Sequence, residues 1–100
     1  MTGKKVYISG RITGLQGYEQ IFAEAEKDLQ ARGAITWNPA VLSLNPGFNW
    51  EDYMRVCLPA IDFCDAIYML ENWQDSRGAR QEHEYALLAG KKVYYEVATR

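Results

Sequence analysis

The stretch DAIYMLENWQDSRGARQEHEYALLAGKKVYYEV, residues 65–97, decides the fold of this chain. Residues 65–70 form an apolar run of strand length, which predicts a buried strand. A helical pattern begins after a capping Asp75 or Ser76 and stops near Gly90, and residues 92–97 predict a second strand. A strand, a helix and a strand in this order form the unit from which parallel sheets are built.

The same alternation continues toward the N-terminus. The further predicted elements are a strand at 6–8, a helix at 18–33, a short strand at 34–37 and a helix at 50–64, with turn-rich segments at 9–17 and 45–47. We expect Pro59, on the polar side of the second of these helices, to bend or split it. The order predicts a single α/β domain over residues 1–100, three-layered and flavodoxin- or Rossmann-like. Its four-stranded, mainly parallel sheet should have the order 2-1-3-4, with helices on both faces.

Composition and charge narrow the function. Apolar residues make up 48% of the 100 residues and charged residues 24%, which is typical of one globular domain. The net charge of −2 gives no indication of a nucleic acid polymer or a membrane as the partner, and no apolar run approaches the roughly 18–20 residues of a membrane span. Cys57 and Cys64 lie on one predicted helix, too far apart for a disulfide, so we expect reduced thiols in the cytoplasm. With these cysteines and one histidine, we expect no metal and no cofactor.

Polar and glycine-rich segments follow the first and the third predicted strands. These segments are residues 9–14 and 71–78. In parallel sheets, ligands bind where the carboxyl ends of the strands meet the loops that follow them. The sequence therefore predicts a ligand site at this edge of the sheet.

Glu82 has an unusual position on the predicted helix. At about 100° per residue it falls within a stripe of small apolar residues formed by Ala79, Ala86 and Ala89, whereas Glu84 falls on the opposite side. Burying an unpaired carboxylate costs several kcal/mol, so a residue in this position needs partners or a role. Two interpretations are open: a catalytic carboxylate, or a structural one that is hydrogen-bonded to Tyr7, Ser9 or a loop amide.

The start of the same helix also has two interpretations. Ser76 is a good N-cap and needs no further role. Alternatively, its hydroxyl and the free amides of the first turn form a phosphate site, assisted by Arg11 and Arg77. Trp73 and Tyr7 either stack on a base or simply pack at their strand ends.

Several segments together resemble one known family. They are VYISGRITG at 6–14, WNPA at 37–40, CDAIYML at 64–70 and SRGARQE at 76–82, followed by Tyr85 and Ala86. This set resembles a phage- and bacteria-associated domain family of unknown function within the nucleoside 2-deoxyribosyltransferase superfamily. It is also similar to the deoxynucleoside-monophosphate N-glycosidases of that superfamily, and the resemblance covers nearly the whole chain.

The resemblance implies a function and a set of site residues. Glu82, in the G-x-x-x-E setting that begins at Gly78, would attack C1′ of a deoxyribosyl group, and Ser76 would hold the 5′-phosphate. Tyr7 would orient the nucleophile. The turn after the first strand would line the nucleotide pocket, and its candidate residues are Ser9, Gly10, Arg11 and Gly14. The implied ligand is a small nucleoside or nucleotide, and the implied assembly is a homo-oligomer.

The sequence departs from the family pattern at Cys57, where active relatives have an aspartate that assists the departing base. A thiol cannot do the work of that carboxylate. Three hypotheses follow: an N-glycosidase or 2-deoxyribosyltransferase with Glu82 as nucleophile, a nucleotide-binding module that senses or sequesters a nucleotide derivative, and a structural or interaction domain. Three outcomes distinguish these hypotheses. Base release that depends on Glu82 supports the enzyme, binding without release supports the binding module, and no binding at all leaves the structural or interaction domain.

Overall fold

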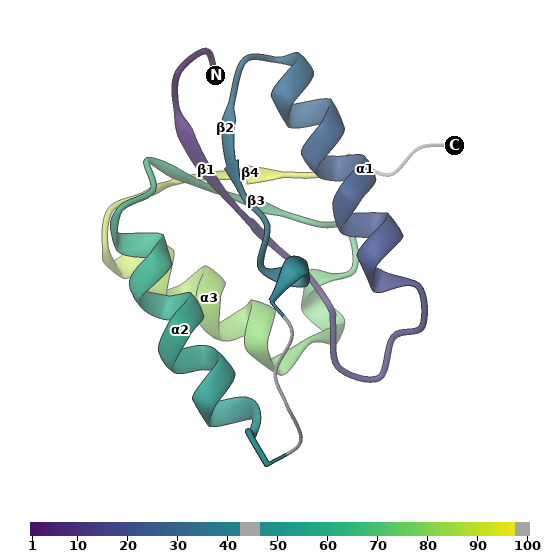
Figure 1. Cartoon of the computed structure of the whole chain (residues 1–100). Helices are drawn as coiled ribbons and strands as arrows, with labels where there is room; N and C mark the ends of the chain where they lie inside the picture. Colours follow the sequence, from purple (N-terminus) through teal and green to yellow (C-terminus); the bar gives the residue numbers. More distant parts are fainter. Residues whose placement is uncertain (43–46, 98–100) are drawn as a thin grey trace.

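The computed structural model describes residues 1–42 and 47–97, and within them it contains a four-stranded sheet and three α-helices (Figure 1). The strands are β1 (Lys5–Ser9), β2 (Ile35–Trp37), β3 (Ala66–Met69) and β4 (Lys92–Tyr95). The α-helices are α1 (Tyr18–Ala31), α2 (Trp50–Asp62) and α3 (Arg77–Leu88), with short 3-10 helices η1 (Pro39–Val41) and η2 (Trp73–Asp75). The predicted turn at 45–47 lies outside the described residues except for Gly47.

All strand pairs are parallel and the strand order is β2-β1-β3-β4, which confirms the predicted α/β fold and its order 2-1-3-4. Strand β1 pairs with β2 on one side and with β3 on the other, so the chain changes direction across the sheet between β1 and β3. Helix α1 lies on one face of the sheet, and α2 and α3 lie on the other (Figure 1). A crevice beside the carboxyl ends of β1 and β3 is where such a fold binds ligands.

The alternation of side chains along β1 divides the core into two layers. Val6 and Ile8 pack toward α1 and contact the cluster that contains Phe22. Tyr7 points to the opposite face, into the cluster under α2 and α3, and Ser9 follows it two residues later on the same face. This register brings two hydroxyl groups of β1 to the layer that holds α3.

The structure corrects some expectations about the helices. Pro59 does not split helix α2, which continues through it as one element, because Pro59 is exposed and water can satisfy the carbonyl that lacks its amide partner. Ala89 is exposed rather than buried, because α3 ends at Leu88 and Ala89 is its C-cap. Strand β4 ends at Tyr95, two residues before the predicted end. Within the described residues, no helix has both the length and the apolar character needed to cross a bilayer.

Candidate active site

The carboxylate of Glu82 is buried between α3 and the sheet. It lies in the second turn of α3 with only 5% of the residue exposed, on the same side of the helix as the buried Ala79 and Ala86. The Tyr7 hydroxyl donates a hydrogen bond to its Oε2 at 2.5 Å, and the Ser9 hydroxyl donates to its Oε1 at 2.7 Å. The two hydroxyls of β1 therefore fix the orientation of the carboxylate.

Burial dominates the acidity of this group. It raises the pKa of Glu82 from 4.5 to about 7, although the hydrogen bonds from Tyr7 and Ser9 act in the opposite direction. The pKa of Tyr7 is raised well above its ordinary value, first by burial and then by the charge of Glu82, so its hydroxyl remains a neutral donor. Glu82 therefore changes its charge near neutral pH, which suits a carboxylate with a chemical role.

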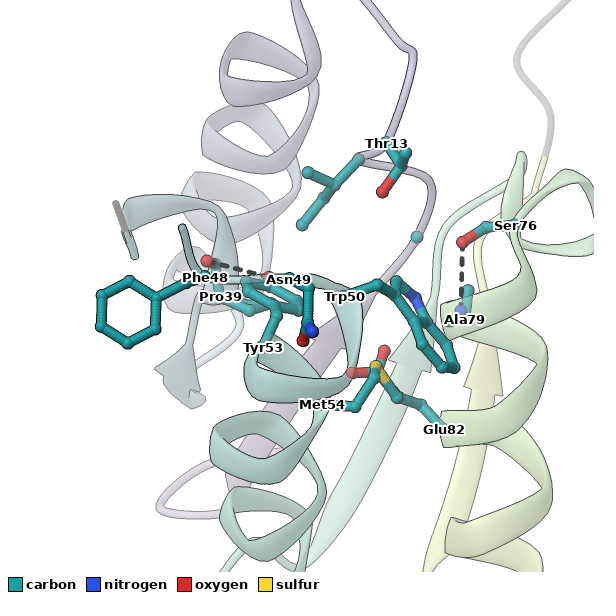
Figure 2. Close-up of a pocket in the computed structure, with 13 residues that line it drawn as sticks. Thr13, Pro39, Phe48, Asn49, Trp50, Tyr53, Met54, Ser76, Ala79 and Glu82 are labelled. Carbon is teal, nitrogen blue, oxygen red and sulfur yellow. Dashed lines mark hydrogen bonds between the residues drawn. The ribbon is translucent and has the colours of Figure 1, made fainter. Parts of the chain in front are cut away.

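A cavity of about 270 Å³ opens beside Glu82 (Figure 2). Its walls come from the turn after β1, from η1 and the start of α2, and from the start of α3. The lining residues are Gly10, Ile12, Thr13, Pro39, Phe48, Asn49, Trp50, Tyr53, Met54, Ser76, Gly78, Ala79 and Glu82. The volume is just below the roughly 300–1,000 Å³ of typical ligand pockets, so the cavity suits one small ligand.

Two glycines allow the walls of the cavity to approach one another. A Cβ on Gly10 would lie 2.6 Å from Leu70 Cδ1 and 2.9 Å from Leu70 Cβ, so only glycine fits between β1 and the end of β3. A Cβ on Gly78 would lie 3.2 Å from Trp50 Nε1, where α3 meets α2. Any larger residue at either position would have to displace a wall of the cavity.

The start of α3 forms one wall of the cavity. Ser76 is the N-cap, and its Oγ accepts a hydrogen bond from the Ala79 amide at 3.1 Å (Figure 2). The first amides of a helix have no intrahelical acceptor, which makes this end a favourable place for an anion. The Arg77 guanidinium lies 4.1 Å from the centre of the Trp50 ring, in a cation–π contact between α3 and α2.

The structure brings together some of the residues that were singled out from the sequence. Gly10, Ser76, Gly78 and Glu82 line the cavity. Tyr7 and Ser9 are fully buried and contact Glu82 instead of the cavity. The remaining four candidates, Arg11, Gly14, Trp73 and Arg77, are not among the residues that line it.

Two of these four have other contacts. The backbone amide of Arg11 donates to Asn72 Oδ1 at 3.0 Å, and its side-chain Nε donates to the carbonyl of Thr13 at 3.4 Å. The ring of Trp73 stacks on His83 with centroids 4.3 Å apart. The aromatic surface beside the cavity is therefore supplied by other residues.

Sequence reasoning missed the wall that α2 provides. Phe48, Trp50 and Tyr53 line the cavity, and the hydroxyl of Tyr53 donates to the carbonyl of Pro39 at 3.1 Å. At helical spacing Trp50 falls on the same apolar stripe as Met54 and Cys57, and spacing alone does not show that the start of α2 faces the start of α3 across a gap. Three aromatic residues within six positions at a helix start are a signal that could have indicated this wall.

Cys57 lies in the core behind the site. It is fully buried and is not among the residues that line the cavity. Burial raises the pKa of its thiol to about 11; the charge of Glu82 adds to this effect, while Tyr7 and Tyr53 lower the pKa. The thiol therefore stays protonated at neutral pH.

Comparisons with known proteins place the chain in a family and identify its fold. A model of the family described as "Domain of unknown function (DUF4406)" matches residues 4–95. Functionally curated proteins give no match. Among solved structures, the chain is similar to a 2-desoxiribosyltransferase from Leishmania mexicana, with a TM-score of 0.69 and 18% identity over 92% of this chain and 63% of that chain. The chain thus spans less than two thirds of that protein, and the likeness shows a shared fold.

Proposed function

The chain belongs to the DUF4406 family, whose description assigns no function, and we propose that it is an N-glycosidase or 2-deoxyribosyltransferase that acts at C1′ of a nucleoside or nucleotide. One observation carries the proposal: the buried carboxylate of Glu82 borders a small cavity and is held in place by two hydroxyls of β1. The fold shared with the 2-desoxiribosyltransferase supports it.

The chemistry follows from the charge of the reacting carbon. Breaking the bond from C1′ to the base develops positive charge at C1′, which an adjacent carboxylate stabilises or traps as an ester. Tyr7 and Ser9 each occupy one lone pair of a Glu82 oxygen, and each oxygen keeps a second lone pair for the attack. Water then releases the sugar in the hydrolytic reaction, and a second base accepts it in the transfer reaction.

The rest of the cavity matches the parts of such a ligand. A 5′-phosphate would bind at the start of α3, next to Ser76 and the first amides of the helix, which have no intrahelical acceptor. The aromatic surfaces of Trp50 and Tyr53 would contact the base. The sugar would lie between them, next to Glu82.

A specific observation favours a second candidate function, a binding module that senses or sequesters a nucleotide derivative without cleaving it. The position at which the family resemblance implies an acid is occupied by Cys57, and this thiol is buried with a raised pKa. A pocket that binds the ligand but cannot protonate an ordinary departing base would retain affinity and lose turnover.

Base release and binding separate these functions. The protein is incubated with each of the common deoxynucleosides and its 5′-monophosphate, and free base is followed by chromatography while calorimetry measures binding. Release by the wild type and by Glu84→Gln, an exposed control on the same helix, but not by Glu82→Gln supports catalysis. Binding without release supports the binding module, and neither event in a folded protein leaves a structural role for Glu82.

We also propose that the chain forms a homo-oligomer in the cytoplasm. Large apolar side chains are exposed near the C-terminal part of the described chain, among them Leu88 at 81% and Val97 at 85%. Sedimentation or light scattering gives the molar mass in solution, and a purely monomeric protein at high concentration would contradict this expectation.

A further inference from the structure

The cavity has one charge and an aromatic wall. Among its thirteen lining residues, all within the described chain, Glu82 is the one side chain that carries a charge near neutral pH, and this charge is negative. Phe48, Trp50 and Tyr53 provide aromatic surface in the same cavity (Figure 2). A carboxylate together with aromatic faces is a favourable setting for a cation, because the face of an aromatic ring is electron-rich.

One of these rings already contacts a cation in the structure. The Arg77 guanidinium lies over the Trp50 ring at 4.1 Å, although it does not line the cavity. The Trp50 ring is therefore able to contact a flat, delocalised cation, a group of the same general kind as a charged heterocycle.

The residues around the cavity also bear on the proton that a departing base requires. Cys57 is buried outside the lining, and its raised pKa makes it a poor acid. Asp52, at the start of α2, is engaged in the capping box of that helix through the Asn49 amide at 3.0 Å. In the described chain, Glu82 is therefore the one carboxylic acid in the lining, and no histidine lies there. The sequence at 43–46, Ser-Leu-Asn-Pro, also contains no acidic residue and no histidine.

We propose that the preferred substrates are N-glycosides whose base carries a positive charge, such as N-alkylated purine or pyridinium nucleosides. A base of this kind takes the electron pair of the broken C1′–N bond and leaves as a neutral molecule, so it needs no proton. A Glu82 oxygen forms the new bond to C1′, and water then cleaves this ester, giving the free sugar, the carboxylate and one proton. This inference rests on the proposed function, because it assigns the substrate class of the same carboxylate.

A matched pair of substrates tests the proposal. The enzyme is given 7-methyl-2′-deoxyguanosine or 2′-deoxyguanosine at a pH at which the alkylated base keeps its positive charge. Each rate of base release is divided by the uncatalysed rate, which removes the intrinsic lability of the alkylated compound. Nicotinamide riboside forms a separate arm that distinguishes a pyridinium from a purine.

Protonation of the leaving group by a general acid typically accelerates a reaction about 10²–10⁴-fold. Release of an uncharged guanine lacks this acceleration in the wild type, because no acid is available to protonate the base. We therefore expect the acceleration for the substrate with a charged base to exceed that for 2′-deoxyguanosine by roughly 100-fold or more. We expect Glu82→Gln to abolish the acceleration. If both purine nucleosides were accelerated equally and in a Glu82-dependent way, the charged-base proposal would be wrong, whereas the proposed glycosidase activity would be supported. If no compound shows Glu82-dependent release, both proposals fail.

Binding gives a readout that does not require turnover. The probes are 1-methylnicotinamide, a stable cation methylated on its ring nitrogen, and neutral nicotinamide, measured by calorimetry well above the pKa of Glu82. We expect the wild type to bind the cation about tenfold more tightly than the neutral compound. We expect Glu82→Gln to lose this preference and Glu84→Gln to keep it. The same preference in Glu82→Gln, or none in the wild type, would contradict the proposal.

Discussion

Replacing Glu82 by glutamine should make the folded protein more stable at alkaline pH. The pKa of Glu82 is raised in the folded state, from 4.5 to about 7, because the buried carboxylate loses its hydration. The folded state therefore holds a proton more tightly than the unfolded state between these two values. It follows that the contribution of Glu82 to stability is fully present below about pH 4.5 and is lost as the pH rises through about 7.

The size of the effect follows from the shift. Each pKa unit corresponds to about 1.4 kcal/mol, so a rise from 4.5 to about 7 costs the folded protein about 3 kcal/mol once Glu82 is fully ionised. Glutamine has nearly the same shape and does not ionise. Its amide nitrogen must face either Tyr7 or Ser9, whose hydroxyl then has to turn and accept, so we expect a net gain of about 2 kcal/mol. For a domain of this size, that gain raises Tm by roughly 8–16 °C.

Denaturant unfolding followed by circular dichroism, at one pH below 4.5 and one above 7, measures this difference for the wild type and Glu82→Gln. Glu84→Gln is the matched control, since Glu84 is exposed on α3 and its replacement should change the free energy of unfolding by less than about 0.5 kcal/mol. The reasoning is refuted if Glu82→Gln is no more stable than the wild type at the higher pH, or if the difference between them does not depend on pH.

Three further substitutions test the same structure. Tyr7→Phe removes a donor to the ionised form of Glu82, so the pKa of Glu82 should rise further, which carbon NMR of the carboxyl group measures directly; an unchanged pKa would contradict the bond. Ser76→Ala removes an N-cap and should cost about 1 kcal/mol in thermal unfolding, and it should weaken binding of 5′-monophosphates more than of nucleosides. Equal weakening would exclude a phosphate site there. Gly10→Ala places a methyl group against Leu70 and should destabilise the fold by roughly 1–3 kcal/mol, and unchanged denaturation would show that the two strand ends can separate easily.

The sheet was predictable because its signals are local. The run at 65–70 is apolar and short, the stop at Gly90 is followed by a second strand, and short connections between alternating elements allow few arrangements besides a parallel sheet. The effect of Pro59 was not predictable from the helix alone. The sequence places Pro59 on the polar side, where the structure also has it, but the helical pattern does not say whether a proline on that side splits the helix.

The candidate site was predictable in one half. A periodicity of two along β1 and the helical wheel of α3 are enough to place Tyr7 and Glu82 in one layer, and both residues lie there. The other half depends on how α2 and α3 face each other. Gly78 and Trp50 approach each other closely, and the cavity lies beside this contact. The spacing of residues within either helix does not indicate that the two helices meet there. Helical spacing alone would therefore place Trp50 in the core, although it lines the cavity.

The ionisation of Glu82 links the stability of the fold to the charge of the ligand that we expect it to bind. Ionised Glu82 opposes folding because few contacts compensate its lost hydration, and a cation in the cavity would supply the missing compensation and lower the pKa of Glu82. A cationic ligand should therefore stabilise the wild type more strongly as the pH rises through about 7, whereas a neutral ligand of the same shape should not. The stability that Glu82→Gln gains without ligand and the stabilisation that a bound cation gives the wild type would therefore have one origin, the lost hydration of the buried carboxylate.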